Sequence, residues 1–200
     1  MIQLSVAVRN ARQDAIESTI GTSPKLQLRT GAPPANCAAA ATGTLVREIT
    51  LPSDWAAAAS NGSKDKAGTW TDNSAGAEGV VGHYRMVDNA GTTCHEQGTV
   101  AMAKTLVTNG VTAANSNVLN FAATTGVVAG MKVTSGTGVV ADSYVLAVTG
   151  TTVTLDKASV AGVGSGVSIV FGGDLTLDNT SVTPNQTITI STWSKTDGNA

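Results

Sequence analysis

The sequence predicts an all-β protein, with a β-sandwich-like host domain that has one N-terminal helix and carries an inserted small β-domain. Three observations support this fold class. Thr, Val, Ala, Ser and Gly dominate the 200 residues, of which 42% are hydrophobic and only 4% aromatic, a composition that favours strands and turns. Short alternating apolar runs recur along the chain, and only one segment has helical periodicity. Between residues 104 and 171, charged residues are almost absent.

The overall charge excludes some classes of partner. Charged residues make up 13% of the chain, and the net charge is −2. Because no basic cluster is present, we expect no nucleic-acid partner and no membrane partner. No secretory signal and no apolar run of membrane-spanning length is recognisable, so we expect synthesis in a cytosol. Reduced thiols are typical there, and we interpret Cys37 and Cys94 as small buried hydrophobes.

Residues 5–20 form the predicted helix. Apolar side chains recur in it at steps of three and four residues, namely Val8, Ala11, Ala15, Ile16 and Ile20. We expect this stripe to face the core and the charged side chains to face mostly solvent, namely Arg9, Arg12, Asp14 and Glu17. Gly21 is placed to end the helix, and Pro24 prevents its continuation.

Strands and turns account for the rest of the host domain. The predicted strands are 26–30, 44–51, a short strand around Trp70, a hairpin over 80–100 with its turn at 88–91, and two last strands after residue 173. Residues 31–43 read as a Gly- and Pro-rich loop. We also expect Ser53 or Asp54 to cap one short helical turn, and residues 61–68 to form a polar turn.

The low-charge block has its own strand pattern. Its predicted strands lie in 118–122, 131–135, 143–150, 152–156 and 167–171. A turn at Thr149-Gly150-Thr151 joins two of them in a hairpin. The unit TGVVAGMKV at 125–133 returns as TGVVADSYV at 137–145, with turn pairs Ala129-Gly130 and Ala141-Asp142. Two copies are too few for a solenoid. We therefore predict a host domain of 1–103 and 172–200 and an inserted β-module of 104–171.

No residue pattern indicates catalysis, a cofactor or a metal. Cys94 and His95 are neighbours on a strand and point to opposite faces, and Cys37 has no paired ligand nearby in the sequence. A Cys94–His83 pair facing across the hairpin is conceivable as a nucleophile, but no third residue orients it. We interpret the acidic residues as turn formers, namely Asp54, Asp65, Asp72, Asp88, Asp142 and Asp156.

The tryptophans allow two interpretations. Trp55, Trp70 and Trp193 would suit a sugar-stacking or interface patch. Because two of them lie in apparent strands, core packing is the favoured interpretation.

Several separate motifs in one order resemble a known group of proteins. They are NARQDAIESTIGTSPKLQLRTGAPPANCAAAATGTL, LPSDWAAAAS, GHYRMVDNAGTTCHEQGTV and GGDLTLDNTSV, within residues 8–100 and 172–191. This arrangement resembles small structural proteins encoded in the head–tail gene clusters of tailed bacteriophages. The shorter relatives run from the QGTV-like strand almost directly into the GGDLTLDN-like strand, so residues 104–171 depart from their pattern. The block itself resembles Thr/Gly/Val-rich β-modules of phage head and tail surfaces.

The resemblance implies a non-enzymatic virion structural protein, made in the cytoplasm of a host bacterium. A capsid decoration (cement) protein on the outer head surface is the favoured role. The alternatives are a tail-associated structural protein and a host-surface or glycan-binding module, and a cell-wall enzyme has weak support. The implied partners are the major capsid protein, other virion proteins and further copies of the chain, for example in a trimer. We expect partner contacts at Arg9, Arg12, Ile16, Ile20 and Trp55.

Overall fold

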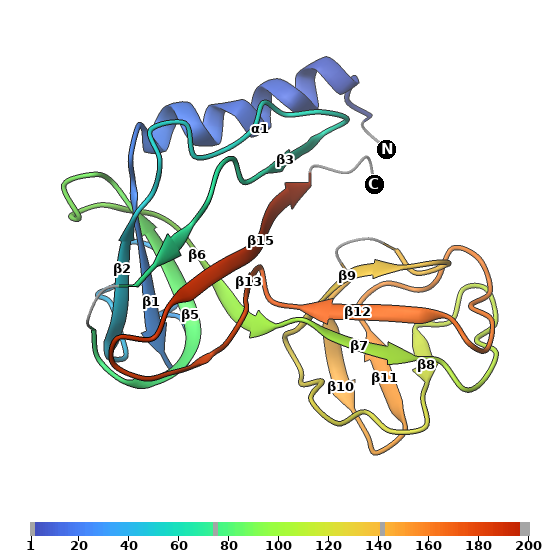
Figure 1. Cartoon of the computed structure of the whole chain (residues 1–200). Coiled ribbons are helices and arrows are strands. Elements are labelled where there is room, and N and C mark those ends of the chain that lie inside the picture. Colours follow the sequence, from blue (N-terminus) through green and yellow to red (C-terminus); the bar gives the residue numbers. More distant parts are fainter. Residues whose placement is uncertain (1–2, 74–75, 141–142, 197–200) are drawn as a thin grey trace. The chain divides into compact units, whose positions relative to one another are not determined.

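The computed structural model describes residues 3–73, 76–140 and 143–196. The chain forms two compact units (Figure 1). Unit 1 comprises Met1–Val100 and Leu175–Ala200, and unit 2 comprises Ala101–Asp174. Strands make up 43% of the structure and helix 8%, which confirms the predicted fold class. The boundaries predicted at 104 and 171 lie just inside unit 2, because that unit begins at Ala101 and ends at Asp174.

Unit 1 contains the helix and a mixed nine-stranded sheet. Its elements are α1 (Val6–Ile20), β1 (Lys25–Thr30), β2 (Leu45–Thr50), β3 (Ser63–Asp65), β4 (Thr71–Asp72), β5 (Gly79–Val87), β6 (Cys94–Met102), β13 (Leu175–Leu177), β14 (Ser181–Val182) and β15 (Ile188–Thr196). The main strand order is β2-β1-β5-β6-β13-β15-β3, with β14 on β5 and β4 on β15. The predicted hairpin over 80–100 is confirmed as the antiparallel pair β5–β6.

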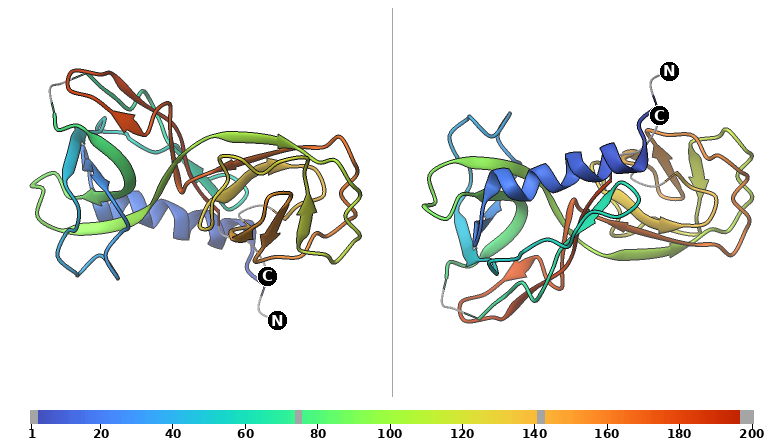
Figure 2. Two further views of the ribbon diagram at one scale, coloured as in Figure 1. Left: turned by 90° about the horizontal axis from the view of Figure 1, so that it is seen from below. Right: turned by 90° about the horizontal axis from the view of Figure 1, so that it is seen from above.

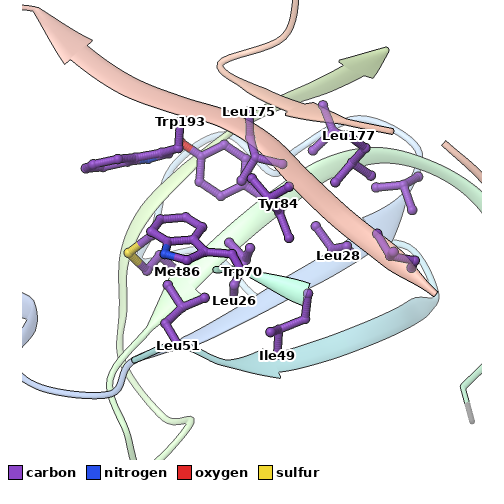
Figure 3. Close-up of a cluster of buried hydrophobic side chains, with 14 of the residues drawn as sticks. Leu26, Leu28, Ile49, Leu51, Trp70, Tyr84, Met86, Leu175, Leu177 and Trp193 are labelled. Carbon is purple, nitrogen blue, oxygen red and sulfur yellow. The ribbon is translucent and has the colours of Figure 1, made fainter. Parts of the chain in front are cut away.

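The core of unit 1 lies between two layers of this sheet. Figure 3 shows β15 crossing over β1 and β5, with buried side chains between them. Trp55, Trp70 and Trp193 pack together, with ring centroids 5.3 to 6.1 Å apart. Each is at most 1% exposed, so the core-packing interpretation of the tryptophans is confirmed. Aromatic side chains of this size supply a large share of the buried apolar area, which compensates for their scarcity.

The helix begins and ends as its sequence predicts. The Ser5 side chain accepts a hydrogen bond from the Val8 backbone N–H and so caps the N-terminus. Gly21 ends the helix with φ at 85°, and its N–H donates to the Glu17 carbonyl. The helix lies beside β3 in Figures 1 and 2.

Two local predictions for unit 1 are wrong. Residues Ser53 and Asp54 begin no helical turn, because the next residues run extended and Ala56 bridges to Lys66. The segment 61–68 is not only a polar turn, because it contains β3, which pairs with the distant end of β15. The sequence of β3 has no apolar alternation, so the strand could not be recognised from the sequence.

Unit 2 consists of two three-stranded antiparallel sheets. Its strands are β7 (Lys104–Val107), β8 (Val118–Asn120), β9 (Lys132–Gly136), β10 (Val145–Val148), β11 (Thr152–Leu155) and β12 (Ser168–Gly172). Their orders are β10-β11-β8 and β7-β12-β9. The core holds aliphatic side chains around Phe121 and Phe171, whose centroids lie 5.9 Å apart. The hairpin predicted at 149–151 is confirmed, while Ala141-Asp142, the second turn pair of the repeat, lies outside the described residues.

Candidate interaction surfaces

A buried lysine fixes α1 to the rest of unit 1. The Lys64 side chain on β3 is fully buried, and its Nζ lies 2.9 Å from Asp14 Oδ1 and 2.8 Å from Glu17 Oε2. It also donates to the Ala57 carbonyl at 2.9 Å. Burial by itself lowers the pKa of Lys64, but the hydrogen bonds to Glu17 and Asp14 outweigh burial, and the pKa is raised. The amine is therefore a charged anchor for one side of the helix.

Side chains on the same side of α1 also form hydrogen bonds with the backbone of the loop before β3. The Asn10 side-chain oxygen accepts from Gly62 N at 2.7 Å, and Asp14 Oδ1 accepts from Ala59 N at 2.9 Å. Arg9 Nη1 donates to the Asn61 carbonyl at 3.3 Å. Of the four charged side chains of the helix, Arg12 and Asp14 are exposed as predicted, whereas Arg9 and Glu17 are half-buried.

The opposite side of α1 is exposed and made mostly of small side chains. We call this surface the outer face of α1; its members are Val8, Ala11, Arg12, Ala15 and Thr19. Val8 is 46% exposed. The predicted inward stripe is therefore only half correct, because its N-terminal members lie outside. Beside the outer face runs a shallow groove of about 310 Å³, lined by Arg12, Ala15, Ile16, Thr19, Ile20 and His95.

The five predicted contact residues do not form one patch. Arg12 belongs to the outer face and to the groove, and Ile16 lines the groove while packing against the core. Arg9 is half-buried and engages the loop at Asn61. Ile20 is 6% exposed and Trp55 is 0% exposed. We correct the prediction for Ile20 and Trp55: both side chains belong to the core.

His95 and Trp55 both contact the region of α1 from distant parts of the sequence. His95 on β6 is exposed and lines the groove next to α1, and the sequence does not show that the fold brings β6 beside the helix. Trp55 Nε1 donates to the Gly21 carbonyl at 3.0 Å, which ties the tryptophan to the end of the helix. Sequence periodicity within either segment carries no sign of these contacts.

The conceivable nucleophile pair does not form. In the hairpin His83 lies opposite Thr99, whereas Cys94 lies opposite Val87. His83 is fully buried, and its Nδ1 lies 2.9 Å from the Gly31 carbonyl. Glu96 is buried and accepts hydrogen bonds from Tyr84 and Trp193. Within the part of the chain that the structure describes, no group of three or more His, Cys, Asp or Glu is arranged to hold a metal ion.

Unit 2 has an exposed surface of a different kind. Two loops, 109–116 and 157–166, are joined by backbone hydrogen bonds that include Thr112–Val163 and Asn115–Ser159 pairs. We call these the paired loops. They present Val111 and Val160, which are 74% and 77% exposed. Two such valines on a fixed backbone are a second candidate contact point.

Comparisons with known proteins add no assignment to these surfaces. No protein family, no curated protein and no solved structure matches the chain significantly. Among the described residues, the helix is too short and too polar to cross a bilayer.

Proposed function

We propose that this chain is a non-enzymatic structural protein of a tailed-bacteriophage virion, and that it decorates the outer head surface. The resemblance of residues 8–100 and 172–191 to phage head–tail proteins supports the class of protein. The observation that carries the contact is the outer face of α1, a rigid helix surface that the fold leaves uncovered. The proposed occupant of this face is the major capsid protein.

The chemistry of α1 suits a packing surface. The polar side of α1 contacts other residues of unit 1, above all Lys64, which binds Asp14 and Glu17. The outer face offers Ala11 and Ala15, whose short side chains allow another backbone to approach closely. Arg12 stands among them, and arginine is over-represented among the residues that dominate binding energy at interfaces.

The connection between the units supports a separable module. The chain leaves unit 1 at β6 and returns at β13, and these strands are neighbours in the sheet. Insertions are tolerated where the host ends lie close together. The core of each unit is built from its own residues. We therefore assign head binding to unit 1 and a peripheral role to unit 2.

Binding to purified heads that lack this protein tests the proposal. We expect Ala15→Arg to weaken binding at least about tenfold in co-sedimentation, because a long charged side chain prevents close packing. The matched control is Ala123→Arg, at an exposed alanine of unit 2, which should bind like the wild type. Deletion of residues 101–174, with a short Gly-Ser linker in their place, should also leave binding intact.

Other outcomes would redirect the assignment. Wild-type binding by Ala15→Arg would remove the outer face of α1 from the proposal. Binding of the wild type to isolated tails but not to heads would favour the tail-associated alternative. The tryptophans give no support to glycan stacking, since all three are buried in the core of unit 1.

A further inference from the structure

A long loop of unit 1 is held down at several points. We call residues 31–43, between β1 and β2, the clamped loop. Its backbone carbonyls accept hydrogen bonds from side chains of the sheet; the donors are Arg29, His83, Arg85 and Gln97. Close approach of the backbones is also required, because a Cβ on Gly82 would lie 2.4 Å from the Gly31 carbonyl oxygen. A loop fixed in this way holds its side chains in defined positions.

The clamped loop brings the only two cysteines of the sequence together. Cys37 lies in the loop and Cys94 is the first residue of β6, and both line one cavity of about 320 Å³. Cys94 is among the groups close enough to Cys37 to affect the pKa of its thiol. Cys37 has no paired ligand nearby in the sequence, but the fold brings Cys94 to the same cavity.

Both cysteines are positioned through their backbones. Arg85 Nη2 donates to the Cys37 carbonyl at 2.7 Å, and Arg85 Nη1 donates to the Ala39 carbonyl at 3.0 Å. Cys94 pairs with Val87 across the hairpin, and its thiol donates to the Glu96 carbonyl at 3.3 Å. Arg85 on β5 thus holds Cys37 close to the β5–β6 hairpin, which carries Cys94.

The surroundings slow the reaction of the Cys37 thiol at neutral pH. Burial raises the pKa of the Cys37 thiol to about 11, and the neighbouring Cys94 side chain adds to this. Little thiolate is present at neutral pH, and the thiolate is the attacking species. Both residues are half-buried rather than enclosed, so a small reagent has access to them.

We propose that Cys37 and Cys94 form an intramolecular disulfide when the folded protein meets a low-molecular-weight disulfide such as oxidised glutathione. One cysteine thiolate attacks the reagent, forms a mixed disulfide and releases one glutathione thiol. The second cysteine then attacks the protein sulfur of the mixed disulfide and releases the other glutathione. The protein loses two hydrogens and two electrons, and the reagent is reduced to two thiols. This inference does not depend on the proposed virion function.

Mass spectrometry of the full chain tests the pairing. The reduced protein is incubated with oxidised glutathione and quenched with acid. We expect the wild type to lose about 2 Da and to keep no glutathione, because the second cysteine completes the exchange. Peptide mapping should then find residues 37 and 94 linked within one chain. The variants Cys37→Ser and Cys94→Ser should each stop at the mixed disulfide and keep one glutathione.

Three results would overturn the proposal. They are a wild type that keeps two glutathiones, a wild type that links to a second chain, and a folded wild type whose thiols stay unreacted while the urea-unfolded chain is oxidised. A single variant that fails to fold leaves the wild-type experiment valid, since that experiment needs no substitution.

Equilibrium with glutathione shows whether the fold favours the bond. The ratio of disulfide to dithiol is measured in a glutathione redox buffer, with and without urea. We expect the folded chain to favour the disulfide by about 30-fold or more over the unfolded chain, since a native disulfide and folding stabilise one another. A correspondingly higher Tm, by roughly 5–10 °C, should accompany oxidation of the wild type but not of Cys94→Ser. A ratio of one, or a fall in Tm, would show that the native geometry opposes the bond.

Discussion

The two units of the chain bury polar groups by different means. Unit 1 encloses charged and ionisable side chains, namely Arg47, Lys64, His83, Arg85 and Glu96. The described part of unit 2 encloses mostly hydroxyl groups, namely Thr108, Thr112, Thr124, Ser143 and Ser159, with Lys132 as its buried charged residue. One chain therefore contains a fold organised around buried charge and a fold organised around buried hydroxyls.

The difference lies in whether the buried polar group carries a charge. Arg47 contacts the carbonyls of Ala77 and Thr183 and lies 3.5 Å from Asp72. Hydroxyls of unit 2 bond to backbone carbonyls: Thr112 donates to Val118 at 3.0 Å. A buried charge must have its partners, or it costs several kcal/mol. We infer that unit 1 depends on single polar residues and unit 2 on the filling of its apolar core.

Removal of one core aromatic from each unit should have the largest effects. We expect Trp193→Ala to destabilise unit 1 by about 4–5 kcal/mol and Phe171→Ala to destabilise unit 2 by about 3–4 kcal/mol. The tryptophan change costs more because it also removes the hydrogen bond to Glu96, which is 2.9 Å long. Hydrogen exchange of backbone amides, read separately for each unit, measures both. Equal losses in both units from one substitution would contradict the separation of the two cores.

Loss of the buried lysine comes next. Lys64→Ala removes the anchor of α1 and leaves Asp14 and Glu17 without it, so we expect a loss of about 2–3 kcal/mol in the free energy of unfolding. The value lies below that of a fully enclosed pair because both carboxylates are partly exposed. Urea denaturation measures it. The matched control Lys66→Ala, two residues along the chain, should change stability by less than about 0.5 kcal/mol. Equal losses of stability in Lys64→Ala and Lys66→Ala would show that Lys64 does not anchor α1.

Local patterns predicted much of this fold, because they depend on neighbours in the sequence. Alternation and turn residues identified β1, β2, the β5–β6 hairpin and the β10–β11 hairpin. The end of the helix followed from Gly21, and its predicted start lies one residue before the observed start at Val6. In each case the physical cause is contained within a few residues, so the sequence displays it.

Contacts between distant segments were beyond such patterns. β3 has the sequence Ser-Lys-Asp, and its partner strand is the distant β15. The orientation of α1 depends on Lys64, which apolar periodicity cannot reveal. For the same reason Trp55 was expected at a partner contact although its side chain is buried, and the position of His95 beside α1 was missed. Arg12 and Ile16 line one groove, and their contact with a partner stays a prediction.

Removal of one buried hydroxyl, that of Thr108, tests how far unit 2 depends on a single polar group. Thr108 Oγ1 donates to the Gly164 carbonyl at 2.7 Å and accepts from Val167 N at 2.9 Å. Thr108→Val keeps the shape but leaves both backbone groups without that partner, so we expect a loss of about 1–2 kcal/mol. Urea denaturation followed at unit 2 amides measures it, and the exposed Thr125→Val is the control. A loss as large as that of Lys64→Ala would show that unit 2 relies on single polar residues as well.

The smallest expected effect concerns the turns of the two hairpins. The β5–β6 turn is closed by a carboxylate, since Asp88 accepts from Thr92 N at 2.8 Å, whereas the β10–β11 turn is closed by the Thr149 hydroxyl, which accepts from Thr152 N at 2.9 Å. The hydrogen bond from the Thr92 backbone, helped by other donors of the turn, lowers the pKa of Asp88 to about 2. A carboxyl group with a depressed pKa stabilises the fold above its unfolded pKa, and this contribution is lost as the pH falls through the folded pKa.

The stability difference between the wild type and Asp88→Asn should therefore be constant from neutral pH to about pH 5 and shrink as the pH approaches 2. Thermal unfolding over this range measures it, and Thr149→Ala is the control, because a hydroxyl that does not titrate should give a difference independent of pH. Thr92→Ala separates the two kinds of donor at Asp88. It removes the hydroxyl but keeps the backbone N–H, so most of the depression of the Asp88 pKa should survive in a side-chain NMR titration. An Asp88 pKa that returns to its ordinary value in Thr92→Ala would assign the effect to the hydroxyl, and the two hairpin turns would then differ less than their geometry indicates.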